Sequence, residues 1–169
     1  LSAESCGQQR EELVAVPDLA PTMLELAGID TPDTMQGRSL RPLLEGTAVD
    51  WRQDIFTEQL MDIQNYPRSE SVRTRDWKYI RYFKRTENPA ASGPFRGTLD
   101  NYNDCLLSSL QQEQPVYEEL YWLETDPLER HNVADDAEHA DALAAMRERV
   151  VELGWEARED DSPPLTLAL

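Results

Sequence analysis

The chain holds few of the side chains that usually carry out catalysis. Its 169 residues include two cysteines and two histidines. Cys6 and Cys105 form no CxxC pair and no metal-ligand spacing, so they form either one disulfide or two reduced thiols, and we expect the thiols. His131 and His139 lie beside or within a predicted closing helix, where we expect a surface or capping role for the first and a solvent-facing one for the second. The pair Asp160 and Asp161 belongs to an acidic run that indicates a solvated tail rather than a metal site.

The chain is strongly acidic. Asp and Glu total 33 against 16 basic residues, which gives a net charge of −17. Nucleic-acid binding depends on neutralising phosphates with basic side chains, so this composition argues against that class of partner. Only Lys78 and Lys84 are lysine, and the other basic residues are arginine. Abundant carboxylates with few lysines indicate either adaptation to high salt or a GC-rich genome, and both explanations stay open.

The length fits one globular piece, since a domain has roughly 150 residues. A hydrophobic content of 40% is enough for a core, while 11 prolines and a mean hydropathy of −0.64 indicate much exposed, loop-rich surface. No apolar run approaches the ~18 residues that span a bilayer. The chain begins at Leu1 rather than Met, so we expect an upstream part, any signal included, to be missing. Localisation, cytoplasmic or exported, stays open.

Two helices are predicted in the first part of the chain. Residues 13–16 form an apolar run that indicates a buried strand or the approach to a helix. Asp18 then offers an N-cap, and a helix of apolar residues at helical spacing continues until Gly28. A shorter helix is predicted over residues 40–45, ending at Gly46.

Short strands dominate the middle of the chain. We predict strands over 54–58, 71–74, 77–83 and 119–123, with the second and third joined as a hairpin. Alternation over 77–83 places Trp77, Tyr79, Arg81 and Phe83 on one face, which indicates a central strand with one side covered. Residues 85–101 indicate a long loop rather than a strand, followed by a short amphipathic helix over 102–110.

A long helix is predicted over 137–155, where apolar residues recur every three or four positions. Before it, Asp126 and Glu129 flank a Pro-Leu pair and predict a capping box that ends the last strand in a turn or a single helical turn. Strands followed by a covering helix predict an α+β fold, with a small antiparallel sheet of about four strands under a long C-terminal helix.

These elements carry a consistent set of motifs. Residues 18–28 have the sequence DLAPTMLELAG, and residues 36–44 have QGRSLRPLL. Further along the chain come SVRT at 71–74, WKYIR at 77–81, ELY at 119–121 and DPLERHNVA at 126–134. In this order and spacing, across about residues 13 to 155, the motifs resemble the end of a type I sulfatase of the alkaline phosphatase-like superfamily.

Within that family the nearest resemblance is to the heparan N-sulfatase (sulfamidase, N-sulfoglucosamine sulfohydrolase) branch. Three features support it: the Tyr66-Pro67-Arg68 segment, the insertion around Tyr102, and residues 155–163 with the sequence WEAREDDSP. The resemblance implies three parts. Residues 1–46 would close the α/β catalytic domain, residues 47–158 would form the C-terminal subdomain, and residues 159–169 would be an irregular acidic, proline-containing tail.

The resemblance also implies a mechanism whose parts lie upstream. Sulfatases use a formylglycine nucleophile, matured from a Cys-x-Pro-x-Arg motif, and a calcium ion held by Asp and Asn residues. Cys6 and Arg10 have the motif spacing, but Gln8 stands in place of the proline. We therefore expect calcium and formylglycine in the missing N-terminal part, no cofactor in this chain, and no turnover of sulfate esters by this chain alone.

The C-terminal subdomain of a sulfatase can lend residues to the rim of the substrate pocket. The resemblance makes four residues after the first subdomain strand the substrate-binding candidates: Glu58, Gln59, Tyr66 and Arg68. The Glu58 carboxylate could face sugar hydroxyls or pair with an arginine. The Arg68 guanidinium could bind a sulfate or uronate bidentately, or pair with Glu70.

Three functions follow. The first is the C-terminal part of a sulfatase, with the missing catalytic domain as its partner, a sulfated carbohydrate as its substrate, and no membrane span. The second is a free-standing, non-catalytic interaction module that uses its acidic face. The third is the tail of a related phosphodiesterase or phosphonate hydrolase. The residues present do not indicate whether the parent enzyme would hydrolyse a sulfate ester or an N-sulfate.

Overall fold

The computed structural model describes residues 7–47, 49–59, 67–83 and 113–157. The chain divides into two compact units, Leu1–Ile55 and Phe56–Leu169, and each is described by itself. The predicted helix over 102–110, both cysteines and the acidic tail lie outside the described residues. No helix within the described ranges is long and apolar enough to cross a membrane.

The first unit contains two helices. A 3-10 turn, Val16–Asp18, leads directly into α1, Leu19–Leu26, and a short α2 spans Arg41–Glu45. Gly46 follows α2 with a φ of 72°, the left-handed conformation that favours glycine at a helix end. Both predicted helices are therefore present, with ends that differ by one or two residues from the prediction.

Asp18 occupies the N-cap position of α1, but its side chain does not cap the helix as the sequence predicted. It is buried, and its carboxylate accepts hydrogen bonds from the backbone N–H groups of Ala15 and Arg38, each at 2.8 Å. The guanidinium of Arg52 donates to both carboxylate oxygens, at 2.5 and 2.8 Å. Burial alone would raise the pKa of Asp18, but these hydrogen bonds outweigh it and lower the pKa below its ordinary value. The side chain makes no cap to α1 because the arginine and the two backbone donors occupy it.

The contacts around Asp18 also explain why a glycine occupies position 37. A Cβ atom on Gly37 would lie 2.0 Å from the carbonyl oxygen of Pro17, a contact that no side chain can make. Gly37 therefore allows residues 36–38 to approach the start of α1 closely enough for Arg38 to donate its N–H to Asp18.

One stripe of α1 is exposed within the described part of the chain. Leu19, Met23 and Leu26 recur at helical spacing and are 51%, 64% and 51% exposed. The opposite side of the helix holds Pro21 and Thr22, which are buried.

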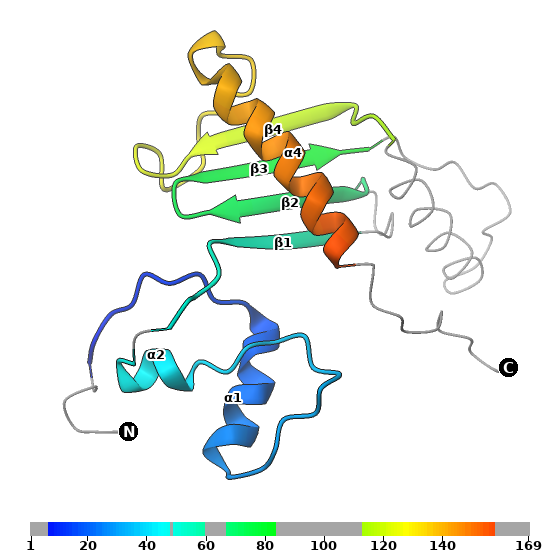
Figure 1. Ribbon diagram of the computed structural model, residues 1–169. Helices are drawn as coiled ribbons and strands as arrows, with labels where there is room; N and C mark the ends of the chain where they lie inside the picture. The colour runs from blue at the N-terminus through cyan, green and yellow to red at the C-terminus, as the bar shows by residue number, and fades with distance from the viewer. Residues whose placement is uncertain (1–6, 48, 60–66, 84–112, 158–169) are drawn as a thin grey trace, which may run out of the picture. The chain divides into compact units, whose positions relative to one another are not determined.

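The second unit is a four-stranded sheet with the order β1-β2-β3-β4, crossed on one face by a long helix (Figure 1). The strands are β1, Asp54–Gln59; β2, Ser69–Thr74; β3, Trp77–Tyr82; and β4, Tyr117–Trp122. Strand β3 pairs antiparallel with both β2 and β4. A 3-10 turn, Ala137–His139, precedes the helix α4, Ala140–Glu156. The predicted α+β fold with its covering C-terminal helix is confirmed.

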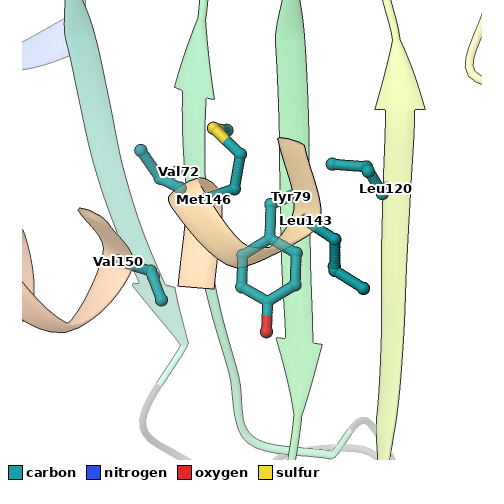
Figure 2. Packing of buried hydrophobic residues seen from close by; sticks show 6 residues of the cluster. All are labelled: Val72, Tyr79, Leu120, Leu143, Met146 and Val150. Carbon is teal, nitrogen blue, oxygen red and sulfur yellow. The ribbon is translucent and has the colours of Figure 1, made fainter. Parts of the chain in front are cut away.

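The core lies between α4 and the sheet (Figure 2). Val72, Tyr79 and Leu120 stand side by side in register on β2, β3 and β4, because successive side chains in a strand alternate between faces. From α4, residues spaced by three and four positions pack onto this row: Leu143, Met146 and Val150.

One residue near the end of the core, His139, differs from the sequence prediction. His139 is half-buried rather than solvent-facing, since its ring packs edge-on against Trp77 and Trp122, at 5.4 and 5.6 Å between centroids. These two tryptophans stack directly on one another across β3 and β4. The apolar stripe of the sequence ran through Ala140 and therefore did not reveal that the preceding turn aims the imidazole at the pair.

The predicted capping box at 126–129 forms only in part. The Asp126 carboxylate accepts the N–H groups of Arg130 and His131, at 2.7 and 2.8 Å, so the aspartate does organise a turn. Glu129 does not complete the box. Its φ of 55° is left-handed, and its carboxylate accepts a hydrogen bond from Lys78 instead. His131 lies at the surface, as expected.

Candidate functional site

The face of the sheet beneath α4 changes from apolar to charged along the strands. The register places Glu70, Arg81 and Glu118 side by side, one row beyond Val72, Tyr79 and Leu120. Alternation keeps both rows on the same face, since the two rows are two residues apart in every strand. The sheet therefore positions an acid–base–acid row next to the core.

Glu70 and Arg81 form a buried ion pair. The Glu70 side chain is fully buried and that of Arg81 is 10% exposed. Both Nε, at 2.9 Å, and Nη2 of Arg81 donate to the same carboxylate oxygen of Glu70. A carboxylate held so far from water needs such a partner, because an unpaired buried charge is very costly.

Arg68 lies beside this pair, immediately before β2. Its guanidinium carbon is 3.9 Å from the centre of the Phe83 ring, and that of Arg81 is 5.2 Å from the same ring. Its backbone oxygen accepts the N–H of Phe83 at 3.0 Å, which extends the β2–β3 pairing by one step. The side chain is only 3% exposed, and it donates to the carboxylate of Glu113.

Arg147 brings α4 into the same network. Its Nε donates to Glu118 at 2.8 Å and its Nη2 donates to the other carboxylate oxygen, a bidentate pair. The hydroxyl of Tyr79, which points along β3 away from the apolar row, also donates to Glu118 (Figure 2). The hydrogen bonds from Arg147 are the main cause that lowers the pKa of Glu118, while burial and the Glu118 carboxylate raise the pKa of Tyr79.

Six charged residues form what we call the arginine–glutamate cluster, and four of them, Arg81, Glu113, Glu118 and Arg147, line a hollow of about 350 Å³. The cluster consists of Arg68, Glu70, Arg81, Glu113, Glu118 and Arg147. The hollow is lined by Tyr79, Arg81, Glu113, Gln114, Pro115, Glu118, Arg147 and Val151. Guanidinium, amide and carboxylate groups converge there, so the arrangement suits the binding of an anionic or hydroxyl-rich group.

The structure brings one of the four predicted site residues, Arg68, into this cluster. It pairs with Glu113, while Glu70 pairs with Arg81. Glu58 and Gln59 are exposed at the end of β1. Because Phe56 packs onto the core, alternation places Glu58 on the helix-covered face and Gln59 on the other. Tyr66 lies outside the described residues.

Of the other members of the cluster, sequence reasoning named only Glu70, as an alternative partner of Arg68, and did not identify the rest as site residues. Arg81 could have been recognised as a buried charge, since the strand alternation already placed it on the covered face with Trp77 and Tyr79. Glu113 follows the predicted long loop and Arg147 lies on a predicted surface of α4, so neither showed a pattern. Their role depends on strand register and on where α4 crosses the sheet.

A metal site is a separate question. Within the described ranges, no group of three or more His, Cys, Asp or Glu side chains could hold a metal ion.

Comparison with solved structures identifies the class of fold. The structure of BT4656 in complex with D-glucosamine-2-N,6-O-disulfate matches with a TM-score of 0.60 and 24% identity, over 85% of this chain and 24% of that one. The phosphonate monoester hydrolase of Agrobacterium radiobacter matches with a TM-score of 0.60 and 22% identity, over 90% of this chain and 27% of that one. At these identities the likeness is one of fold.

The sequence identifies the family. Residues 3–90, more than half of the chain, match the family model described as N-sulphoglucosamine sulphohydrolase, C-terminal, and the chain belongs to that family. An ulvan-active sulfatase of Formosa agariphila is 29% identical over 137 residues, 79% of this chain. The N-acetylglucosamine-6-sulfatase of Homo sapiens is 32% identical over 146 residues, 76% of this chain. The match covers only 27% and 24% of the lengths of these relatives. The predicted kinship with the C-terminal part of a sulfatase is confirmed.

Proposed function

We propose that this chain serves as the C-terminal subdomain of a sulfatase that hydrolyses sulfate from a carbohydrate. In this proposal it stabilises the enzyme and contributes to the rim of the substrate pocket, while the nucleophile and the calcium site belong to a separate catalytic domain. The observation that carries the proposal is the family match, together with relatives that are sulfatases and of which this chain covers about a quarter.

The exposed stripe of α1 supports a structural partner. Leu19, Met23 and Leu26 place three large apolar side chains in contact with water, an arrangement typical of a surface that packs against another protein part. In the proposed enzyme that part is the catalytic domain of the same polypeptide.

The rim role rests on Glu58 and Arg68, with Gln59 and Tyr66 beside them in the sequence. In the complete enzyme, Glu58→Ala is expected to raise KM severalfold with little change in kcat, because the carboxylate would contact substrate hydroxyls and not the reacting sulfur. Glu152→Ala on the exposed side of α4 is the matched control. If KM for the sulfated carbohydrate is the same in both variants, Glu58 does not belong to the pocket.

A phosphonate monoester hydrolase is the second candidate, because a protein with that activity shares the fold at the same TM-score as the BT4656 structure with its bound disulfated glucosamine. Assays of the complete enzyme with a sulfated monosaccharide and with a phosphonate monoester separate the two. A higher kcat/KM for the sulfated sugar supports our proposal, and a higher value for the phosphonate ester overturns it in favour of the second candidate.

A further inference from the structure

One of the three glutamates of the arginine–glutamate cluster, Glu113, lies at its exposed edge. Three arginines face three glutamates, so the net charge of the cluster is zero. Among the six described members of the cluster, the two least exposed arginines are Arg68 and Arg81, and the one fully buried carboxylate is that of Glu70. Glu113 neutralises the remaining positive charge, and its side chain is 36% exposed. Without the Glu113 carboxylate, these six described residues would together carry one excess positive charge beside the hollow.

The donors that face Glu113 are fixed independently of it. The Arg68 guanidinium stacks on the Phe83 ring at 3.9 Å and is 97% removed from solvent, and the pairing of its backbone with Phe83 holds the main chain. A guanidinium stacked on an aromatic ring loses little further freedom when it binds an anion. Its N–H groups therefore remain aimed at the position that the carboxylate of Glu113 now occupies.

We propose that Arg68, with Arg81 beside it, forms an oxyanion-binding site that Glu113 fills from within the chain, and that a sulfate or carboxylate group of a ligand binds there by displacing Glu113. Sulfate, like carboxylate, can present a pair of acceptor oxygens to a guanidinium group. The adjoining hollow of about 350 Å³ has room for one sugar ring, and Gln114 and Arg147 supply further donors along it. The class of ligand is thus an acidic or sulfated sugar.

This inference deepens the proposed rim role of Arg68, and its sugar component rests on the proposed function. The oxyanion site itself can be tested on the 169-residue chain with inorganic sulfate and with glucuronate, in the absence of any catalytic domain. A failure of the site would therefore leave the sulfatase proposal standing, and a failure of the sulfatase proposal would leave the site.

The central experiment compares the wild-type chain with Glu113→Gln, which keeps the shape of the side chain and removes its charge. Because the internal competitor is lost, Glu113→Gln should bind sulfate about tenfold more tightly than wild type by calorimetric titration. Glu119→Gln, on the opposite face of β4, is the matched control and should behave like wild type. Chloride at equal ionic strength corrects for screening.

Two further measurements assign the binding to Arg68 and identify the group. In NMR spectra of arginine side chains, the Nε–H signal of Arg68 should shift on addition of sulfate to Glu113→Gln, and Arg68→Met in that background should abolish the gain in affinity. Tighter binding of sulfate than of glucuronate would assign the site to a sulfate group, and the reverse order to a uronate.

The proposal is overturned if Glu113→Gln binds neither anion more tightly than Glu119→Gln, or if the gain survives Arg68→Met. Glu113→Asp is a second variant in case Glu113→Gln does not fold. It keeps the negative charge on a shorter side chain, so its affinity for sulfate should lie between those of wild type and Glu113→Gln. If neither Glu113 variant folds, the carboxylate is a fixed structural partner of Arg68, and the proposal also fails.

Discussion

Replacing Glu70 by Gln should show how strongly the buried row of charges depends on pairing. The change keeps the shape of the side chain but leaves the Arg81 guanidinium, 10% exposed, without its carboxylate. Removing one partner of a buried ion pair costs about 3–5 kcal/mol. Since the amide oxygen of Gln still accepts a hydrogen bond, we expect a loss near the lower end, about 3 kcal/mol in the free energy of unfolding.

Urea unfolding followed by tryptophan fluorescence measures this loss, because Trp77 and Trp122 lie over the same sheet face. A loss of about 3 kcal/mol corresponds to a fall in Tm of roughly 10 °C for a domain of this size. Glu152→Gln is the matched control, since Glu152 also accepts from an arginine, Arg149, but is 51% exposed. An exposed pair contributes at most about 1 kcal/mol.

A double variant sharpens the test. Replacing Arg81 by Met in the Glu70→Gln background removes the unpaired charge and should recover part of the lost stability, since an apolar side chain can replace a buried ion pair at little cost. If Glu70→Gln is no more destabilising than Glu152→Gln, the pair is not buried as described, and the reasoning about the cluster is refuted.

Three further predictions follow from other parts of the chain. Gly37→Ala should destabilise the fold by several kcal/mol, because its Cβ would meet the carbonyl oxygen of Pro17 at 2.0 Å; a thermal shift within about 1 °C would contradict this. The lowered pKa of Glu118 means that its contribution to stability is complete above the ordinary pKa of glutamate and is lost as the pH falls through the lowered value. Urea midpoints of Glu118→Gln should therefore fall less than those of wild type between about pH 5 and about pH 3, and parallel pH profiles would refute the assignment. Met23→Ser on the exposed stripe of α1 should reduce self-association of the isolated chain in light scattering, whereas a wild-type chain that is already a monomer would show that the stripe drives no association.

The sequence predicted the architecture because the strands carry strong local patterns. Alternation over 77–83 identified the covered face of β3, and the spacing of Leu143, Met146 and Val150 identified the face of α4 that packs on it. The turn at Gly46 was also predictable, since its left-handed conformation is encoded by the residue itself. These features depend on neighbours within a few residues.

The arginine–glutamate cluster was less predictable because its contacts join residues that are far apart in the sequence. Arg68 and Glu113 are 45 residues apart, and Arg147 reaches Glu118 over 29 residues from another element. Asp18 shows the same limit, since its local context indicates a helix cap while a distant arginine, Arg52, takes its carboxylate. Where a charged residue could pair locally or at long range, the sequence did not reveal which partner it takes.

The most direct test of the account is the mass of the native protein in its source, captured with an antibody to this chain. The 137 residues that match the ulvan-active sulfatase are 27% of its length, which corresponds to a protein of about 500 residues. The account therefore predicts a species about three times the 19.4 kDa of this chain, carrying a sulfatase catalytic domain. A native species of 19.4 kDa would contradict it and would show that the chain acts as a free-standing module.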